Sequence, residues 1–289
     1  MKTGSNNIDI VNGPLAAGIL RFAWPLMLSN LLQIAFHSAD TLVIGRFAGP
    51  AALAAVGTAG PVSIFFTWGL NGLSIGANVI ISRLIGKQDH DSVKQAVCTA
   101  FLIGVCSGFI VLCLGTAGAG LFMRLMSVPE DILAYSVLYM RIFFLAAVPV
   151  GIYDFCAAVL RSDGDTARAT LYLAIGGVIN VLLNLLFVIV LHLGVAGVAT
   201  ATVISHWIAA VLILKRLLSY EGIIQLKPKE TFFDRSLAAA MLKSGIPSAL
   251  QNQLFSFSNI MIQSSFNTFG SAVIAANTAA LCVEEYVYV

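Results

Sequence analysis

Long apolar runs, separated by short stretches of polar and charged residues, divide this chain into units that are long enough to cross a lipid bilayer. The hydrocarbon core of a bilayer is about 30 Å thick and is spanned by about 20 apolar residues in a helix. We therefore expect an all-α polytopic membrane protein. The pattern predicts helical segments over residues 15–44, 51–84, 95–123, 132–160, two within 169–214 joined by a turn at 192–197, 237–266, and a short one from about 270.

Lysine and arginine gather on one side of these predicted crossings. Only Arg46 and Arg124 fall on the other side, and Arg141 falls inside the fourth segment; the remaining basic residues lie on the side of the N-terminus. By the positive-inside rule, the N-terminus and the loops after the second, fourth and sixth segments are cytoplasmic.

The seventh segment repeats features of the first at an offset of 222 residues. The matched pairs are Pro25 with Pro247, Asn30 with Asn252, His37 with Asn259 and, after a one-residue gap, Gly49 with Gly270. Six crossings separate the two copies, an even number, so both copies enter the membrane in the same direction and the repeat is parallel.

The repeat predicts a division of the chain into two bundles. We expect a cytoplasmic N-terminus over residues 1–13, a six-helix bundle over 14–219, a cytoplasmic linker over 220–236, and the first two helices of a second bundle over 237–289. Because this second copy is incomplete, we expect the chain to be a fragment or a truncated reading frame. The alternative is a protein of six to eight helices that pairs with another chain.

A polar stripe interrupts the first apolar segment. At about 100° per residue, a helix places Asn30, Gln33, His37 and Asp40 within an arc of about 80°. An ionised carboxylate in hydrocarbon costs at least about 2.5 kcal/mol. We therefore expect Asp40 to face the interior of a bundle or a water-filled cavity.

Composition excludes several other classes of protein. Of the 289 residues, 58% are hydrophobic and only 10% are charged, and the mean hydropathy is +0.91, far from the values of a soluble domain. Basic residues do not cluster with aromatic ones, so we expect no nucleic acid partner. The five cysteines lie in apolar segments without a CxxC pair, which favours free thiols. We expect no enzymatic activity, because no nucleophile, metal cluster or phosphate loop is evident.

Five stretches, in this order and at these spacings, resemble the multidrug and toxic compound extrusion (MATE) transporters. They are Ser38–Arg46, Gly76–Arg83 with Gly86 and Lys87, Leu160–Asp165, Val178–Asn180 with Asn184, and Gly194–Thr202. The resemblance implies twelve helices in two bundles, alternating access, and export of organic cations and other amphipathic compounds in exchange for Na⁺ or H⁺. It implies no cofactor beyond this coupling ion. We expect the full-length protein to be a monomer in the plasma membrane.

The resemblance also implies a coupling site in the first bundle, at Asp40, Asn180, Asn184 and Thr202. Many family members carry Asp where this chain has Asn184, so Asp40 is the only acid of the group. If the ion is Na⁺, Asp40, Asn180 and Thr202 would supply its oxygen ligands. Asn180 and Asn184 are four residues apart and share one helix face, from which both amides can reach Asp40.

A lone carboxylate among neutral amides favours proton exchange over tight Na⁺ binding, because burial disfavours the charged form of the acid. His37, one turn before Asp40, is a candidate modulator of that proton. Glu284 maps through the repeat onto Ser63 and is a candidate counterpart of Asp40 in the second bundle. For Asp154 we expect a structural pairing with Arg161 rather than a role in transport.

Two other functions remain open from the sequence. A lipid-linked oligosaccharide flippase of the same superfamily would need a cationic cavity for pyrophosphate, and Arg141 is the only arginine inside a segment. The chain could instead be a truncated, non-transporting fragment that acts at most as a membrane interaction partner.

Overall fold

The computed structural model describes residues 15–227 and 233–284, except for the side chains of residues 15–23, 25, 26, 29, 30 and 33. Within these ranges the chain forms helices and no strands, so the all-α prediction is confirmed. The elements are α1 (Leu15–Phe47), α2 (Pro50–Gly86), α3 (His90–Leu125), α4 (Glu130–Phe143), η1 (Phe144–Ala146), α5 (Ala147–Ser162), α6 (Thr166–Asn184), η2 (Leu185–Val190), α7 (Gly194–Leu218), α8 (Arg235–Asn267) and α9 (Ser271–Glu284).

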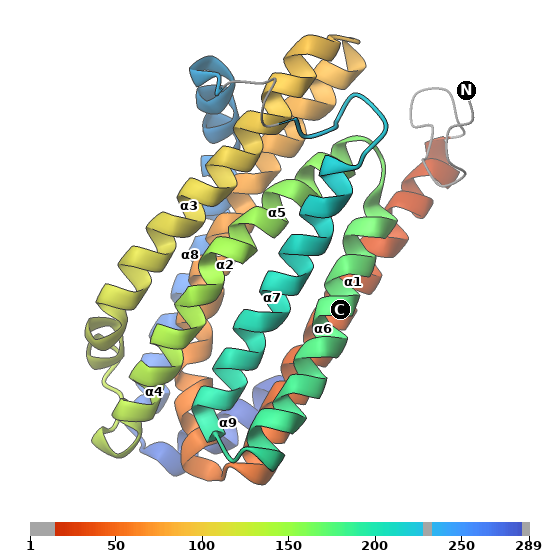
Figure 1. Ribbon diagram of the computed structural model, residues 1–289. Coiled ribbons are helices and arrows are strands. Elements are labelled where there is room, and N and C mark those ends of the chain that lie inside the picture. Colours follow the sequence, from red (N-terminus) through yellow and green to blue (C-terminus); the bar gives the residue numbers. More distant parts are fainter. Residues whose placement is uncertain (1–14, 228–232, 285–289) are drawn as a thin grey trace.

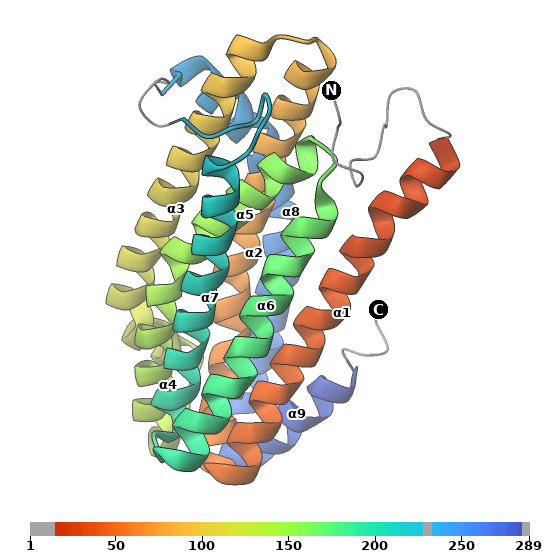
Figure 2. The ribbon, with the colours of Figure 1, turned by 45° about the vertical axis from the view of Figure 1, so that its right-hand side comes forward.

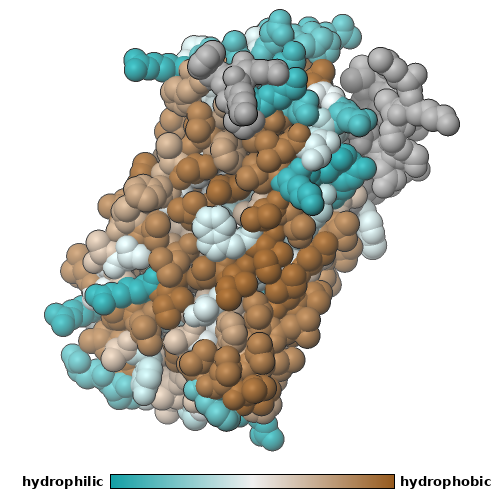
Figure 3. Space-filling model, in the orientation of Figure 1, coloured by the Kyte–Doolittle hydropathy of each residue, from teal (hydrophilic) through white to brown (hydrophobic). Residues whose placement is uncertain are grey.

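The long helices lie side by side and run alternately up and down (Figures 1 and 2). The turns after α2, α5 and α7 lie at the end where α1 begins, and the turns after α1, α3, α6 and α8 lie at the opposite end. The face seen in Figure 3 is apolar over its middle and hydrophilic at its two ends, as expected of a membrane-embedded surface. The protein is a multi-pass membrane protein.

Five helical stretches of the described chain are long and apolar enough to cross a membrane. They are Pro50–Gly86, His90–Leu125, Glu130–Ser162, Thr166–Val190 and Gly194–Leu218. The helix α8 has 33 residues, which matches the length expected of a seventh crossing, but polar residues recur along it and it does not reach the same hydropathy. The apolar helix α9 is short, as expected.

The predicted fourth segment is one crossing made of three pieces. A 3₁₀ turn, η1, joins α4 to α5 in the middle of this crossing. Pro149 explains the irregularity, because it has no N–H to donate to the carbonyl one turn earlier. The last part of this crossing, α5, is the most enclosed stretch, since it packs against α2, α3 and α7.

Aspartates cap three helices at the end where α1 begins. Asp89, Asp165 and Asp234 accept hydrogen bonds from backbone amides in the first turns of α3, α6 and α8. Hydrogen bonds from Ser92 to Asp89 and from Ser236 to Asp234 hold the pKa values of these two carboxyls below their usual range, because they stabilise the charged form.

The two predicted repeat copies share a backbone feature at their turns. Gly49 precedes α2 and Gly270 precedes α9, and each has a φ angle of +91°. This left-handed conformation favours glycine, which has no Cβ to clash. The same residue type in the same conformation at matched positions supports the parallel repeat.

The first helix of the second copy, α8, packs closely against α2, with the two backbones in direct contact at glycines of α2. A Cβ atom on Gly76 would lie 2.0 Å from the backbone oxygen of Met241 and 2.6 Å from the backbone nitrogen of Gly245. A Cβ atom on Gly72 would likewise meet the backbone of Ala249 at 2.5 Å. Glycines on one face of α2 therefore determine how closely α8 approaches.

Replacing one of these glycines should separate the two helices. We expect Gly76→Val to lower the free energy of unfolding by about 3 kcal/mol, because the backbone of α8 cannot yield to an added side chain. The measurement is thermal unfolding of the purified protein in detergent. Gly60→Val is the matched control, since a Cβ at Gly60 of α2 meets nothing within 4 Å. Equal stability of the two variants would contradict the prediction.

Candidate functional site

Asp40 lies on α1, seven residues before the end of the helix at Phe47. Its carboxylate accepts a hydrogen bond from the side-chain nitrogen Nδ2 of Asn184 on α6. Among the described residues Asp40 forms no ion pair within 4.0 Å. The expectation that Asp40 faces the interior of the bundle fits this contact, which joins two helices that are far apart in the sequence.

Asn180 and Asn184 are buried on α6 and point the same way, as their spacing predicts. Asn184 Nδ2 also donates to Asn180 Oδ1 at 3.2 Å. Immediately after Asn184 the helix widens into a π-helical stretch, η2. Such local widening of a helix is frequent at functional sites.

Thr202 brings a third helix, α7, into the same network. Asn180 Nδ2 donates to Thr202 Oγ1 at 3.3 Å, and the Thr202 hydroxyl donates to the backbone oxygen of Val198 at 3.0 Å. A continuous chain of hydrogen bonds therefore runs from Asp40 through Asn184 and Asn180 to Thr202. The structure brings together these four predicted residues.

One oxygen in this network has no partner. Asn184 is fully buried, its nitrogen donates to two oxygens, and its side-chain oxygen Oδ1 has no hydrogen-bond partner in the described part of the chain. A buried acceptor without a donor is costly. The oxygen is satisfied if a proton donor or a cation enters the site beside Asp40.

The other predicted site residues lie outside this network. The side chain of His37 is exposed, although it is on α1 one turn from Asp40. Glu284 is exposed at the last described position of α9. The side chains of Asn30 and Gln33 lie outside the described residues.

Two further residues near the network are not among the predicted site residues. His206 lies one turn after Thr202 on α7, and its Nδ1 is 2.8 Å from the backbone oxygen of Thr202. A carbonyl oxygen only accepts, so Nδ1 carries a proton. Tyr139 of α4 is buried in the neighbourhood of Asp40. The i, i+4 spacing to Thr202 could have indicated His206, whereas nothing in the sequence pairs Tyr139 with α1.

The predicted structural pairing of Asp154 with Arg161 does not take the form of a direct ion pair. Within the described chain the ion pairs are Lys94–Asp91 and Arg168–Asp165. Asp154 instead accepts a long hydrogen bond of 3.5 Å from Asn71 Nδ2 on α2, and Arg161 acts on it only at longer range. Two helical turns separate the two residues, and the guanidinium group of Arg161 does not come within ion-pair distance of the Asp154 carboxylate.

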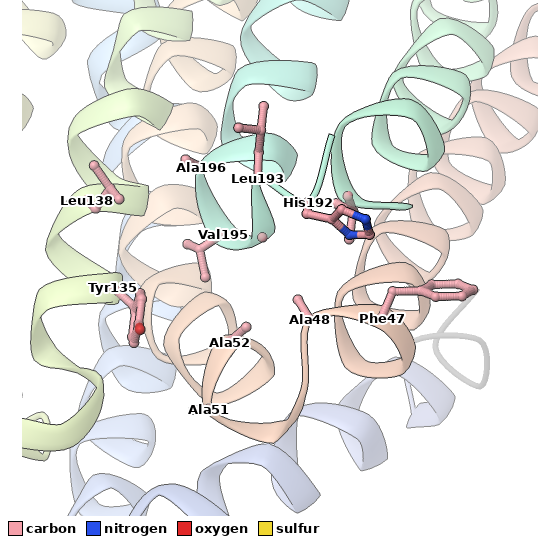
Figure 4. Close-up of a pocket in the computed structure, with 12 residues that line it drawn as sticks. Phe47, Ala48, Ala51, Ala52, Tyr135, Leu138, His192, Leu193, Val195 and Ala196 are labelled. Carbon is pink, nitrogen blue, oxygen red and sulfur yellow. The ribbon is translucent and has the colours of Figure 1, made fainter. Parts of the chain in front are cut away.

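A hollow of about 430 Å³ lies at the end of the bundle away from the start of α1 (Figure 4). Residues at the α1–α2 turn, the α6–α7 turn and the outer part of α4 surround it, including Phe47, Tyr135 and His192. None of the four residues of the hydrogen-bond network lines this hollow. The hollow and the network are therefore separate features of the same half of the molecule.

Solved structures share this fold. An inward-facing multidrug resistance MATE family transporter of the MOP superfamily superposes with a TM-score of 0.81 at 24% identity, over 91% of this chain and 60% of that one. An outward-facing structure, also titled as a multidrug resistance MATE family transporter, gives a TM-score of 0.84 at 22% identity, over 99% of this chain and 66% of that one.

Curated relatives match nearly the whole chain. The probable multidrug resistance protein YpnP of Bacillus subtilis (strain 168) is 29% identical over 273 residues, which make up 92% of this chain and 60% of that protein. The multidrug export protein MepA of Staphylococcus aureus (strain MRSA252) is 21% identical over 263 residues, covering 91% and 58% of the two chains. The chain thus spans about three fifths of the length of these relatives.

The MatE family model matches residues 25–186, which include Asp40, Asn180 and Asn184. The match covers more than half of the chain and agrees with the resemblance, the relatives and the fold. The chain therefore belongs to the MatE family, the MATE transporters, which are membrane transporters and not enzymes.

Proposed function

We propose that this protein is a secondary active antiporter that exports drug-like organic cations and other amphipathic compounds in exchange for H⁺. The observation that carries the proposal is the intramembrane carboxylate of Asp40, hydrogen-bonded to Asn184 on a second helix. The names of YpnP and MepA, a probable multidrug resistance protein and a multidrug export protein, support the substrate class.

Hydrogen-bond directions in the network favour a proton over Na⁺. A sodium ion needs oxygen ligands, and Asp40, Asn180 and Thr202 are the candidates. Yet each of these residues already receives an N–H from an asparagine amide, Asn184 Nδ2 for Asp40 and Asn180, and Asn180 Nδ2 for Thr202. A cation at these oxygens would compete with the amide N–H groups that already point at them, whereas a proton needs only one carboxylate oxygen of Asp40.

The unpartnered oxygen of Asn184 gives the proton a second partner. When Asp40 is ionised, Asn184 donates to it through Nδ2. When Asp40 is protonated, its O–H becomes a donor, and rotation of the Asn184 amide would present Oδ1 as the acceptor. Asn180, whose Oδ1 now accepts from Asn184 Nδ2, would rotate with it and donate to Asn184 Oδ1 instead. The site can thus satisfy both protonation states of Asp40 without moving a helix.

Exchange then follows from competition for one negative charge. An organic cation is attracted to ionised Asp40 and loses that attraction when the acid is protonated, so proton binding from one side favours release of the cation. If the site opens alternately to the two sides of the membrane, entry of a proton is coupled to export of the organic cation. The bilayer and the small-molecule substrate are the partners that this function requires, and the full-length protein would act as a monomer.

The distribution of basic residues supports an orientation for this cycle. We infer a location in the cell membrane with the N-terminus in the cytoplasm, because the end of the bundle where α1 begins also carries most of the lysines and arginines. Asp40, near the other end of α1, would then lie in the half of the membrane closer to the outside.

The test is efflux of a fluorescent organic cation from membrane vesicles that carry the protein expressed from its complete reading frame. We expect a pH gradient alone to drive efflux and a Na⁺ gradient alone to leave it at the level of vesicles without the protein. Efflux driven by Na⁺ alone would overturn the proton assignment. Absence of efflux under both gradients would overturn the antiport function.

The flippase alternative finds less support in the structure. A cavity for pyrophosphate would need an inward-facing basic residue within the first bundle, and Arg141 was the candidate. Arg141 is exposed on the outer surface between α3 and α4, and the described residues that form the polar network carry no positive charge.

A further inference from the structure

Two arginines share a hollow on the lipid-facing surface of the molecule. Arg124 of α3 and Arg141 of α4 line a depression of about 410 Å³. The remaining lining residues are Gly120, Leu121, Leu133 and Val137, all without charge. Hydrophilic side chains interrupt the apolar surface in this region, at the lower left of Figure 3.

Arg141 lies at the depth of the membrane interior. It follows the start of α4 at Glu130 by 11 residues, which corresponds to about 16 Å along the helix axis at 1.5 Å per residue. Arg124 lies at the end of α3, level with the start of α4. Side chains of a helix lean toward its N-terminus, so Arg141 extends toward the level of Arg124.

Neither arginine has an acidic partner within ion-pair distance in the described part of the chain. The nearest acids in the sequence, Glu130 and Asp131, are exposed at the start of α4 and do not line the hollow. Leu121 and Leu125, on the same helix as Arg124, are 61% and 70% exposed, as expected where α3 faces lipid. The guanidinium groups are therefore exposed and open to a negatively charged group from outside the described chain.

A phospholipid phosphate fits this requirement. Guanidinium groups bind phosphate oxygens through paired, charge-assisted hydrogen bonds. The apolar walls formed by Leu133 and Val137 would cover the glycerol and the first part of an acyl chain. We propose that Arg124 and Arg141 bind the headgroup of an anionic phospholipid in the leaflet opposite the start of α1.

The test is the stability and lipid binding of the purified protein in detergent with added phosphatidylglycerol or phosphatidylcholine. We expect phosphatidylglycerol, and not phosphatidylcholine, to raise the melting temperature and to remain bound in native mass spectrometry. Arg124→Gln and Arg141→Gln should each weaken phosphatidylglycerol binding about tenfold, a change of about 1.4 kcal/mol in binding free energy. Both variants should fold, because neither side chain is buried.

Arg46→Gln is the matched control, since Arg46 is an exposed arginine at the same end of the bundle and does not line the hollow. It should bind phosphatidylglycerol as the wild type does. Equal effects of both lipids on the wild type, or equal binding by Arg46→Gln and Arg141→Gln, would overturn the site. Equal protection by inorganic phosphate would show a general anion site and overturn the assignment to a lipid. None of these measurements depends on transport.

Discussion

Asp40→Asn is expected to reduce efflux driven by a pH gradient to the passive leak of vesicles that lack the protein. Asparagine has nearly the shape of aspartate, and its oxygen can still accept the hydrogen bond from Asn184, so the contact between α1 and α6 should persist. What is lost is the titratable group and the negative charge that attracts an organic cation. Because Asp40 is the only acid in the network, no other residue there can take the proton.

The measurement compares initial rates of efflux from vesicles at equal protein content, with and without a pH gradient. Asp154→Asn is the matched control, because it removes another intramembrane carboxylate that contacts Asn71 and lies outside the network. We expect this control to retain efflux that depends on the pH gradient. An Asp40→Asn protein that exports drug at the wild-type rate would refute the role of Asp40 in coupling.

Much of the fold could be predicted from the chain alone. Apolar runs of sufficient length must become helices in a bilayer, since only helices and closed barrels satisfy every backbone group there. A charged stretch separates the predicted segments 51–84 and 95–123, and the observed turn between α2 and α3 falls within it. The predicted turn at 192–197 also overlaps the break between η2, which ends at Val190, and α7, which begins at Gly194.

The candidate site was predictable only in part. The four-residue spacing of Asn180 and Asn184 placed both amides on one face, and the structure confirms this through their mutual hydrogen bond. The polar stripe could not show which of its members would be covered. His37 and Asp40 lie within one arc of α1, yet Asn184 on the neighbouring helix reaches Asp40 and leaves His37 exposed.

The sequence does not predict which side chains of different helices come into contact. The pairing of Asp154 with Arg161 was expected from their positions on one helix, but the contact that forms is with Asn71 of another helix. Arg124 and Arg141 likewise lie on different helices, on either side of the loop between α3 and α4. Only the packing of α3 against α4 places them in one hollow. Periodicity describes a helix face and does not specify the neighbour that covers it.

Asn184→Asp should change the number of cations that the site binds. The new carboxylate would lie in hydrogen-bond contact with Asp40, at the position where Nδ2 now donates. Two negative charges about 4 Å apart repel by about 4 kcal/mol at an effective dielectric constant of 20. Two carboxylates in such contact do not both remain charged without a proton or a cation between them. We therefore expect the variant to bind one more cation per site than the wild type.

This added charge should also admit Na⁺, because an acceptor oxygen replaces the amide that now donates to the oxygens of Asp40 and Asn180. In vesicles, Asn184→Asp should show efflux under a Na⁺ gradient alone, which the wild type should not. Asn184→Leu is the informative control: it removes the amide without adding charge, and it should lose network contacts without gaining Na⁺ dependence. If Asn184→Asp exports drug only under a pH gradient and binds no additional cation, then the neutral amide at position 184 does not determine ion selectivity, and the preference for protons must arise from Asp40 and its other surroundings.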